Sequence, residues 1–195
     1  MTNQREAAVS LAGRDALIEG RCRCGAVQYQ VNLPWPPLTY ACHCTRCQRA
    51  TGSAFALQMP VPRTALQVTG ELVVAKVSGR DSGRTVHQHC ARCLIGLYGT
   101  SVSRPALVII RAGTVDGSDR IAPLLHLYIS TKLPWLVLPS EVPSFLHDPT
   151  PEEFSKIWSR STPRPGTSRS GSGVDCHSRA VERCAARSGK PTLPL

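Results

Sequence analysis

Seven of the nine cysteines in this 195-residue chain fall into three short clusters. The clusters are Cys22-Arg23-Cys24, Cys42-His43-Cys44-Thr45-Arg46-Cys47 and Cys90-Ala91-Arg92-Cys93. Two thiolates separated by one or two residues can bind one tetrahedral metal ion, because the turn between them brings the sulfur atoms to the spacing that Zn–S bonds of about 2.3 Å require. Three such clusters in one region of a chain predict bound zinc.

Disulfides are the alternative use of clustered cysteines, and the cell compartment decides between the two. Residues 1–20 contain no apolar run long enough for a signal peptide, and the acidic residues Glu6, Asp15 and Glu19 disfavour a transit peptide. No segment approaches the length of about 20 apolar residues that spans a membrane. We therefore expect a cytoplasmic protein without a membrane segment, in which clustered cysteines bind metal or carry out redox chemistry.

The number of ligands suggests two unequal metal sites. A closed structural zinc site takes four protein ligands, whereas a catalytic site takes three and keeps one position for water or substrate. Seven cysteines divide into four and three. We expect the two distant pairs to form the structural site (Cys22, Cys24, Cys90 and Cys93) and the compact triad to form the candidate active site (Cys42, Cys44 and Cys47). In the alternative, the triad is a second structural site completed by a histidine or by a cysteine of another chain.

Histidines near the clusters are weaker candidates for ligands. In an extended segment alternate side chains point to opposite faces, so His43 should point away from the side that Cys42 and Cys44 share. We expect His87 and His89 to be ordinary strand residues, one facing each side of the strand.

Short segments of β-type sequence, separated by turn residues, predict an all-β domain between Gly20 and about Leu146. The expected strands are Ala26–Val31, Thr39–His43, Ala54–Met59, Ala65–Thr69, Leu72–Val77, Arg84–His89, Leu94–Tyr98, Leu107–Ala112 and Leu124–Ile129. One helical turn is expected over Thr45–Ala50, ended by Gly52.

A second helix should begin after Thr150 and run to about Trp158. Thr150, Pro151 and Glu153 supply an N-cap hydroxyl, a proline at N1 and a glutamate at N3, which is the capping-box pattern. Its apolar residues Phe154, Ile157 and Trp158 would pack on the β domain. The expected organisation is an extension (1–17), the zinc-binding β domain (18–146), the C-terminal helix (147–159) and a disordered basic tail (160–195).

The formal net charge of +10 is concentrated in that tail. From Arg160 onward, seven Lys or Arg against two acidic residues supply half of the excess. The remaining body has no compelling need for a polyanion, so we do not expect nucleic acid as a partner. Cys176, His177 and Cys184 lie in the tail, and their spacing matches no zinc module, so we expect two free thiols there.

In their order and spacing the clusters resemble the glutathione-dependent formaldehyde-activating enzyme family, whose domain is shared with vertebrate centromere protein V. The resemblance covers about Ile18 to Leu146. It rests on Gly20-Arg21-Cys22-Arg23-Cys24-Gly25, on Cys42 to Arg49 followed by Thr51-Gly52-Ser53, on Cys90 to Cys93, on Arg111-Ala112-Gly113-Thr114-Val115-Asp116 and on Lys132-Leu133-Pro134-Trp135.

This resemblance implies an Mss4-like fold of twisted β-sheets held together by zinc, with one short C-terminal helix. It implies one structural and one catalytic Zn²⁺ per chain, on the same two cysteine sets that ligand counting gives. The implied activity is that of a carbon–sulfur lyase that acts on S-hydroxymethylglutathione or a related small thiol and aldehyde adduct. The alternative is a non-catalytic, zinc-held binding module for protein or nucleic acid.

Three further residues are candidates for binding the substrate. Arg46 and Arg49 could meet an anionic group such as a glutathione carboxylate, although an exposed arginine is more often only a solvated charge. Trp135 could form a wall of the pocket or pack in the core. An odd number of ligands would also allow a homodimer in which a second chain completes the triad.

One position departs from the family pattern. Leu94 follows the third cluster, where family members usually carry glycine. Glycine suits a turn of positive φ, and a β-carbon there costs about 1 to 2 kcal/mol. Structural zinc contributes about 10 kcal/mol or more, so we expect the site to survive the substitution.

Overall fold

A computed structural model describes residues 16–34, 37–78 and 84–161 of the chain. The chain divides into two units, residues 1–164 and 165–195, and the second lies wholly outside the described residues. The predicted tail from residue 162 onward, with Cys176, His177 and Cys184, therefore lies outside them, as does the predicted extension up to residue 15.

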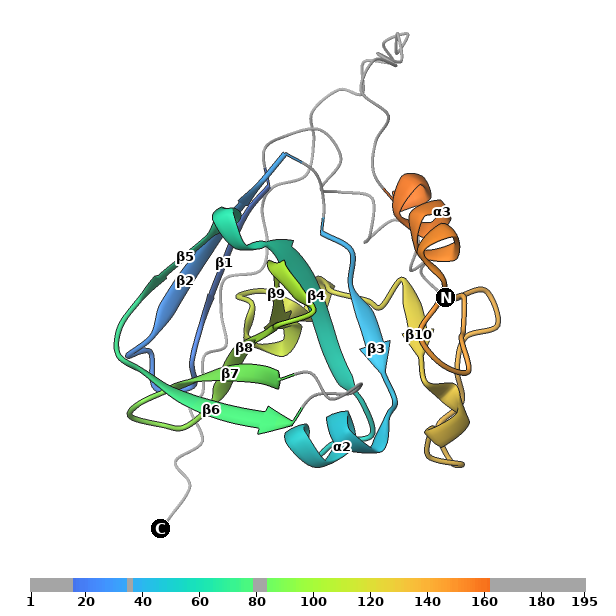
Figure 1. The fold of residues 1–195 in the computed structure, drawn as a ribbon, viewed down its shortest axis with the longest axis horizontal. Helices are drawn as coiled ribbons and strands as arrows, with labels where there is room; N and C mark the ends of the chain where they lie inside the picture. Colours follow the sequence, from blue (N-terminus) through green and yellow to red (C-terminus); the bar gives the residue numbers. More distant parts are fainter. Residues whose placement is uncertain (1–15, 35–36, 79–83, 162–195) are drawn as a thin grey trace, which may run out of the picture. The chain divides into compact units, whose positions relative to one another are not determined.

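The described part is built mainly from β-strands in two sheets, which confirms the all-β prediction (Figure 1). The smaller sheet has the order β1-β2-β5, with β1 Ala16–Arg21, β2 Gln28–Leu33 and β5 Leu66–Thr69. The larger has the order β10-β3-β4-β9-β8-β7-β6, with β3 Tyr40–Cys42, β4 Ala56–Pro62, β6 Leu72–Ser78, β7 Arg84–Cys90, β8 Gly96–Ser101, β9 Arg104–Arg111 and β10 Leu125–Leu127. Every pairing is antiparallel except that of β10 with β3, which is parallel.

Alternating burial explains how the sheets form a core. In β2 every second side chain is buried, namely Tyr29, Val31 and Leu33, while the polar residues between them are exposed. In β9 Val108 and Ile110 are buried in the same way. These inner faces meet in one apolar cluster that draws on both sheets. Its members are Cys22, Val27, Tyr29, Val31, Leu33, Met59, Val61, Cys90, Leu97, Val108, Ile110, Ala112 and Val115.

Strand β1 was not among the predicted strands, because its sequence has only two large apolar residues, Leu17 and Ile18. It is held in place by β2 over its whole length and by a close approach at Gly20. A β-carbon on Gly20 would lie 2.3 Å from the Tyr29 ring and 2.7 Å from the Thr114 carbonyl oxygen. Glycine is therefore required where β1 crosses this part of the core.

Strand β4 continues past its predicted end at Met59. Pro60 and Pro62 make the sequence unlike that of a central strand, since proline donates no hydrogen bond to a neighbour. In the structure β3 pairs only with residues 56–58, and the rest of β4 pairs with β9 alone. The prolines thus lie where one side of the strand has no partner in the sheet.

Both predicted helices are present. Helix α2, Thr45–Thr51, has Cys44 as its N-cap and ends at Gly52, whose φ of 60° is left-handed. Helix α3, Pro151–Ser161, begins with the predicted capping box: the Glu153 amide donates to Thr150 Oγ1 at 3.2 Å, and the Thr150 amide donates to Glu153 Oε2 at 2.8 Å. Short 3₁₀ turns occur at Arg63–Ala65, Ala112–Thr114, Ser118–Arg120 and Ile129–Thr131.

A second apolar cluster joins α3 to the sheet. Leu38, Leu125 and Leu127 are buried, and Phe154 and Ile157 of α3 pack against them. Figure 1 shows α3 next to β10, at the end of the large sheet. The predicted apolar face of the helix is confirmed at these two positions, while the Trp158 side chain lies outside the described part.

Candidate metal centres

Four cysteines from two distant hairpins meet at one point. Cys22 and Cys24 lie at the turn between β1 and β2, and Cys90 and Cys93 lie at the turn between β7 and β8. Their four sulfur atoms lie within 4.8 Å of one another. The Cys22 and Cys24 sulfurs are 3.4 Å apart, and those of Cys24 and Cys90 are 3.8 Å apart. This group joins the small sheet to the large one and could hold a metal ion.

The two turns that carry these cysteines share a residue of positive φ directly after the second cysteine. The Gly25 amide donates to the Cys22 carbonyl at 3.0 Å, and the Leu94 amide donates to the Cys90 carbonyl at 2.9 Å. Gly25 has φ 74° and Leu94 has φ 59°. Leu94 therefore occupies a positive-φ position of the kind that favours glycine, and its side chain is 67% exposed.

Backbone amides are directed at the sulfur atoms of this group. The Val27 amide donates to Cys22 Sγ at 3.3 Å, and the Arg92 and Cys93 amides donate to Cys90 Sγ at 3.4 and 3.5 Å. Burial alone would raise the pKa of Cys22, but the Val27 amide and the neighbouring thiols lower it to about 6. A hydrogen bond from the Ala26 backbone lowers the pKa of Cys24, but desolvation and the thiols of Cys22, Cys93 and Cys90 outweigh it and raise this pKa to about 11. The backbone amides thus favour a thiolate at Cys22, the form that binds metal.

The remaining three cysteines form a second group around the start of α2. Cys42 ends β3, Cys44 caps α2 and Cys47 lies in its first turn. The three sulfurs lie within 4.8 Å of one another, and Cys42 and Cys44 are buried. The Cys47 amide donates to Cys44 Sγ at 3.3 Å, and Gln58 Nε2 of β4 donates to Cys47 Sγ at 3.7 Å. Figure 1 shows α2 directly beyond the end of β3, which is how three nearby positions in the sequence become a triad in space.

The chemistry of the triad fits a cation. The pKa of Cys42 is raised, first by its contacts with the thiols of Cys44 and Cys47 and then by burial. Three thiols packed this closely cannot all ionise unless a positive charge joins them. A soft divalent ion would satisfy the three sulfurs together, so both groups could bind metal.

His43 is directed away from the triad, in agreement with the prediction. Its Nε2 lies 2.9 Å from Nδ1 of His126, and its ring is fully buried. Its backbone is held on both sides: the amide donates to the Leu127 carbonyl at 2.9 Å, and the carbonyl accepts from Gln48 Nε2 at 2.7 Å and from Thr131 Oγ1 at 3.1 Å. These bonds fix the chain between Cys42 and Cys44.

His87 and His89 do not face opposite sides as predicted. Their rings lie 6.5 Å apart, centroid to centroid, above Gly99 and Gly96 of the neighbouring strand. Residues two apart on a strand share a face, so the expectation of one ring on each side was wrong. The missing side chains of the two glycines make room for the two rings.

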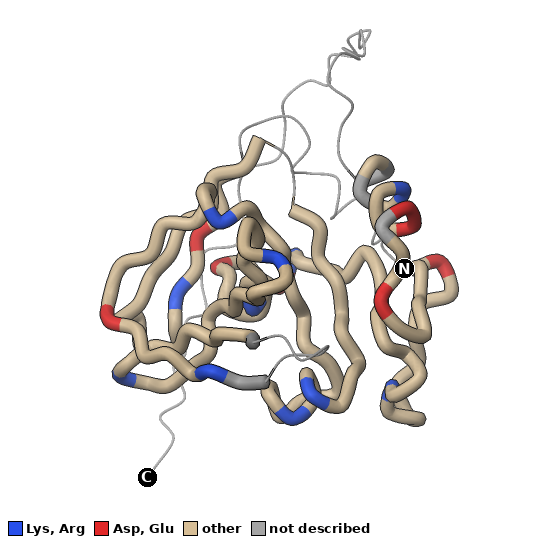
Figure 2. Tube along the Cα trace, viewed as in Figure 1, with Lys and Arg blue, Asp and Glu red and all other residues tan. Residues whose placement is uncertain are grey.

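The predicted substrate residues lie on the surface. Arg46 and Arg49 are exposed on α2, which carries basic and no acidic residues (Figure 2). Trp135 is 68% exposed, so it is not a core residue. Its segment follows Thr131, whose carbonyl accepts from Gln48 Nε2 of α2 at 2.9 Å. The segment after β10 thus runs beside the helix that carries Cys47.

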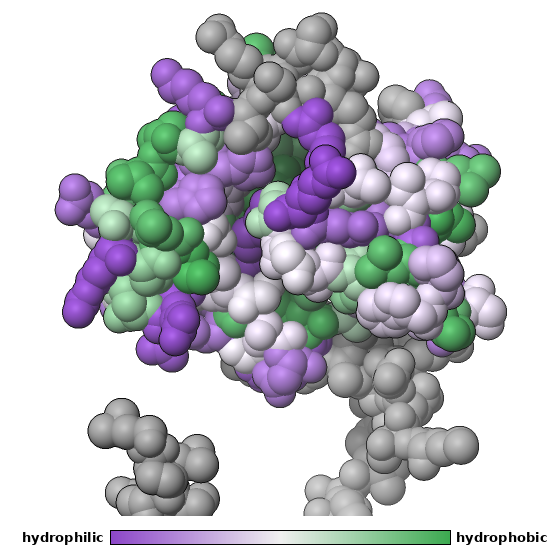
Figure 3. Space-filling model, turned by 90° about the horizontal axis from the view of Figure 1, so that it is seen from below, coloured by the Kyte–Doolittle hydropathy of each residue, from purple (hydrophilic) through white to green (hydrophobic). Residues whose placement is uncertain are grey.

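The surface seen from the side of α2 and β6 is mixed. Hydrophilic side chains cross the middle of this face, and hydrophobic ones gather on its left in Figure 3. Among the exposed apolar residues of β6 are Val73 and Val74, at 42% and 54% exposure. These valines lie on an edge strand. Two exposed apolar side chains are common on a protein surface and do not by themselves form an apolar patch.

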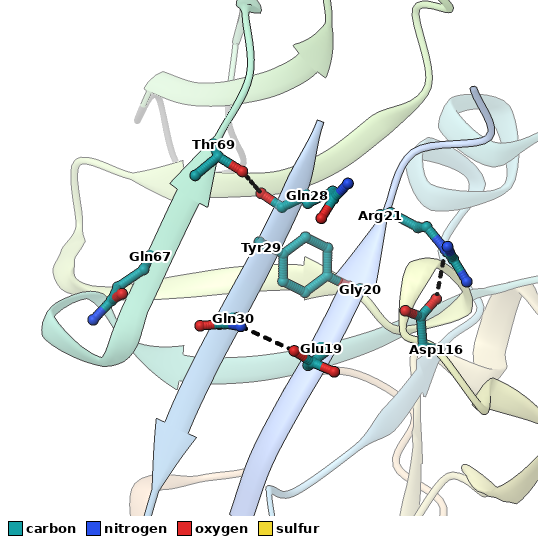
Figure 4. A pocket seen from close by; sticks show the side chains of 9 residues that line it. All are labelled: Glu19, Gly20, Arg21, Gln28, Tyr29, Gln30, Gln67, Thr69 and Asp116. Atoms are coloured by element: carbon teal, nitrogen blue, oxygen red, sulfur yellow. Dashed lines mark hydrogen bonds and ion pairs between the residues drawn. The ribbon is translucent and has the colours of Figure 1, made fainter. Parts of the chain in front are cut away.

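The larger cavity lies away from the cysteines. It has a volume of about 470 Å³ and is lined from β1, β2 and β5 and by Asp116, mostly with polar side chains (Figure 4). Within it Arg21 forms an ion pair with Asp116 at 3.0 Å. A second hollow of about 350 Å³ lies at Cys90, between Ala26, Glu71 and Arg92. Neither is lined by the triad.

Two residues near the triad were missed as site residues. Gln58 stands in a largely apolar strand and contacts Cys47, and Arg111 ends the apolar strand β9 directly opposite Gln58. A polar residue inside an apolar strand is the signal that could have found both.

Among the helices of the described residues, none has the length and apolar character that a membrane span requires.

Comparison with known proteins identifies the family. A family profile described as glutathione-dependent formaldehyde-activating enzyme matches residues 17–131, more than half of the chain. The chain belongs to this family. The resemblance expected from the cysteine clusters is confirmed, and the matched region contains both groups of cysteines.

Two named relatives agree with the family assignment. A Halomonas elongata protein, provisionally named glutathione-dependent formaldehyde-activating enzyme, is 28% identical over 148 residues, which cover 73% of this chain and 94% of the relative. A Penicillium rubens protein with the same provisional name is 32% identical over 81 residues, 40% of this chain and 41% of the relative. A solved Rhodobacter sphaeroides protein structure is 21% identical, with a TM-score of 0.41, and the match covers 65% of this chain and 98% of that one.

Proposed function

We propose that the chain is a zinc-dependent carbon–sulfur lyase that acts on S-hydroxymethylglutathione or a related small adduct of a thiol and an aldehyde. The observation that carries the proposal is the inequality of the two cysteine groups. One has four sulfur ligands and the other has three, with no fourth His, Cys, Asp or Glu grouped with the triad among the described residues. Four ligands suit a structural zinc, and three suit a zinc that also binds a substrate.

The proposed roles follow from this division. Cys22, Cys24, Cys90 and Cys93 would hold the structural ion, while Cys42, Cys44 and Cys47 would hold the catalytic one. Zinc at the triad would supply Lewis acidity and lower the pKa of a substrate thiol, so that the thiolate forms at neutral pH. The activity is proposed for the cytosol, where glutathione is abundant and cysteines stay reduced.

The reaction itself needs no oxidant or reductant. In the lyase direction the carbon–sulfur bond of the adduct breaks, its electron pair goes to sulfur, and the hydroxyl proton leaves as the carbonyl forms. Addition of the thiol to the aldehyde is the reverse. Residues of the chain would bring the substrate to the triad: the exposed Arg46 and Arg49 would draw an anionic substrate toward α2 by long-range attraction, and the exposed Trp135 would cover its apolar part.

Gln58 and the hydrogen bonds around His43 would maintain the geometry of the triad. Gln58 Nε2 donates to Cys47 Sγ, and Gln48 and Thr131 hold the His43 carbonyl between the other two cysteines. Hydrogen bonds of this kind orient metal ligands and tune their basicity. They also leave the ligands little freedom to collapse onto the ion and close the open position.

Substitution of Cys44 by serine tests the assignment. Serine is a good N-cap residue, so α2 should remain intact. We expect the variant to lose turnover and one metal ion per chain while keeping its circular dichroism spectrum and its second ion. Full activity in this variant would show that the triad is not the active site. A protein that binds two ions in closed sites and turns over no thiol adduct would instead be a binding module.

A further inference from the structure

Arg111 is half-buried, and one nitrogen of its guanidinium group has no partner in the described part of the chain. Its Nη1 atom is inaccessible to solvent and makes no hydrogen bond there. The one ion pair among the described residues joins Arg21 and Asp116, on the small sheet. A buried guanidinium nitrogen without a partner is costly, and its presence in a folded protein calls for an explanation such as a bound anion.

The position of Arg111 in the sheet places it on the side of the triad. Arg111 of β9 lies directly opposite Gln58 of β4, and residues opposite each other in an antiparallel pair project from the same face. From that face Gln58 Nε2 reaches Cys47 Sγ at 3.7 Å. Arg111 therefore stands one strand further from the triad than the residue that contacts it.

The neighbouring strands β9, β8 and β7 continue this face. Ile109 lies two residues before Arg111 on the same face, and Gly99 lies opposite Ile109 on β8. A β-carbon on Gly99 would lie 3.1 Å from Nδ1 of His87, so the imidazole fills the place of the missing side chain. The face beside the triad thus presents Gln58, Arg111 and His87 in succession.

The charges that act on His87 are positive. Burial is the first cause that lowers the pKa of His87, and the charges of Arg111, His89 and Arg46 lower it further. The pKa of Cys47 is lowered by the Cys42 thiol and, more weakly, by the Arg111 charge, but the Cys44 thiol and burial raise it to about 11. Arg111 is thus close enough to influence both the triad and the imidazole.

We infer that Arg111 is the anion-binding residue of the triad site and holds a carboxylate of the substrate while the thiol occupies the position beside Cys42, Cys44 and Cys47. The inference rests on the proposed thiol-binding function and names the residue that selects among thiols. A guanidinium binds a carboxylate through two parallel hydrogen bonds, and such a bond is stronger when it is shielded from water. Arg49, which is exposed, would contribute little by comparison.

A matched pair of ligands tests this role. Glutathione and its dimethyl ester carry the same thiol and differ only in their two carboxylates. Isothermal titration calorimetry with the zinc-loaded full chain should give an ester affinity roughly 10- to 100-fold below that of glutathione. In the Arg111→Met variant we expect the two affinities to become nearly equal, with the affinity for the ester unchanged.

Three further variants make the result specific. Arg104→Met removes an exposed arginine from the same strand and should keep the wild-type ratio of affinities. Arg49→Met should reduce the ratio by no more than about threefold. Arg111→Lys keeps the positive charge at this position without the planar fork, so it should retain only part of the ratio of affinities; this variant tests the role even if the methionine variant fails to fold. Circular dichroism establishes the folding of each variant.

The outcomes separate this inference from the proposed function. A wild-type protein that binds glutathione and its ester equally well, or an Arg111 variant pair that keeps the full wild-type ratio, would overturn the role of Arg111 and leave the thiol-binding function standing. Binding of neither compound would overturn both. If Arg49→Met made the affinities for glutathione and its ester equal while Arg111→Met kept the wild-type ratio, the carboxylate would bind to α2 instead of β9.

Discussion

Nε2 of His43 and Nδ1 of His126 lie 2.9 Å apart in the interior of the large sheet. His43 follows β3 and His126 lies in β10, the two strands that pair in parallel. Both rings are buried, and the outer nitrogen of each has no hydrogen-bond partner among the described residues. A hydrogen bond between two ring nitrogens needs one of them as acceptor, so at least one ring must be neutral. The pair fastens β10 beside the triad.

The histidine pair should make stability depend on pH. The pKa of His43 is lowered to about 4, first by burial and then by His126, and burial also lowers the pKa of His126. In the unfolded chain both titrate near 6.5, so the unfolded state takes up protons first as the pH falls. The stability from the neutral pair is therefore complete above about pH 6.5 and is lost as the pH falls toward the folded pKa values.

Urea unfolding of wild type and His126→Asn at about pH 7.5 and about pH 5.5 measures this effect. Asparagine keeps a polar group near Nδ1 but does not titrate. We expect the free energy of unfolding to fall more steeply with acid in the wild type than in the variant. Metal loss affects both proteins alike, so an equal decline in the two would contradict the role of the pair.

Alanine at position 20 should destabilise the protein severely. The added β-carbon would overlap the Tyr29 ring and the Thr114 carbonyl, and Tyr29 is buried and bonded to Thr114 Oγ1 at 2.8 Å. We expect a loss of about 2 to 4 kcal/mol in the free energy of unfolding, as for other overpacked cores. Gly113→Ala is the matched control, because nothing lies within 4 Å of its added β-carbon. Similar midpoints for the two variants would refute the close approach of β1 to the core.

Glycine at position 94 should stabilise the protein. Leu94 holds φ 59° with a largely exposed side chain, so its replacement relieves strain and loses little burial. Relief of about 1 to 2 kcal/mol, less the entropy that glycine adds to the unfolded state, leaves a gain of about 0.5 to 1 kcal/mol. The converse change is Gly25→Ala, at φ 74° in the matching turn, which should cost about 1 kcal/mol. Thermal unfolding with metal bound measures both variants. A midpoint that does not rise for Leu94→Gly, or does not fall for Gly25→Ala, would contradict the role of positive φ in these turns.

Metal analysis should find two ions of different character. We expect two zinc ions per chain, and cobalt substitution should give one site with four sulfur ligands and one with three sulfurs and an exchangeable ligand. Cys24→Ser should weaken the first site and lower the unfolding midpoint, because that site joins the two sheets. Cys44→Ser should remove the second with a smaller effect on unfolding. Two spectroscopically identical, closed sites would argue against a catalytic triad.

Much of the metal chemistry could be predicted from local spacing. The turns at the two cysteine pairs and the helical turn over Thr45–Ala50 were expected from neighbouring residues, whereas the role of Cys44 as the N-cap of α2 was not predicted. The grouping of four and three followed from ligand counting, and the sulfur distances agree with it. The capping box at Thr150 was equally local and equally recognisable.

The residues around the triad could not be predicted from the sequence, because their contacts depend on the pairing register of the strands. Gln58 and Arg111 come together through the pairing of β4 with β9, and His87 through the pairing of β7 with β8. Strand β1 has too few large apolar residues to be recognised alone and is specified by its partners. Side-chain contacts between paired strands depend on the register of the pairing, which periodicity within one segment does not encode.

The four-cysteine group bridges positions 66 residues apart, from Cys24 to Cys90. An ion seated there would act as a reversible cross-link across a long stretch of chain, and removing it would restore a large conformational entropy to the unfolded ensemble. The fraction of molecules able to react would then track free metal concentration as well as temperature. At low zinc concentration such a protein would lose activity because it unfolds, even though the residues of the triad are chemically unchanged.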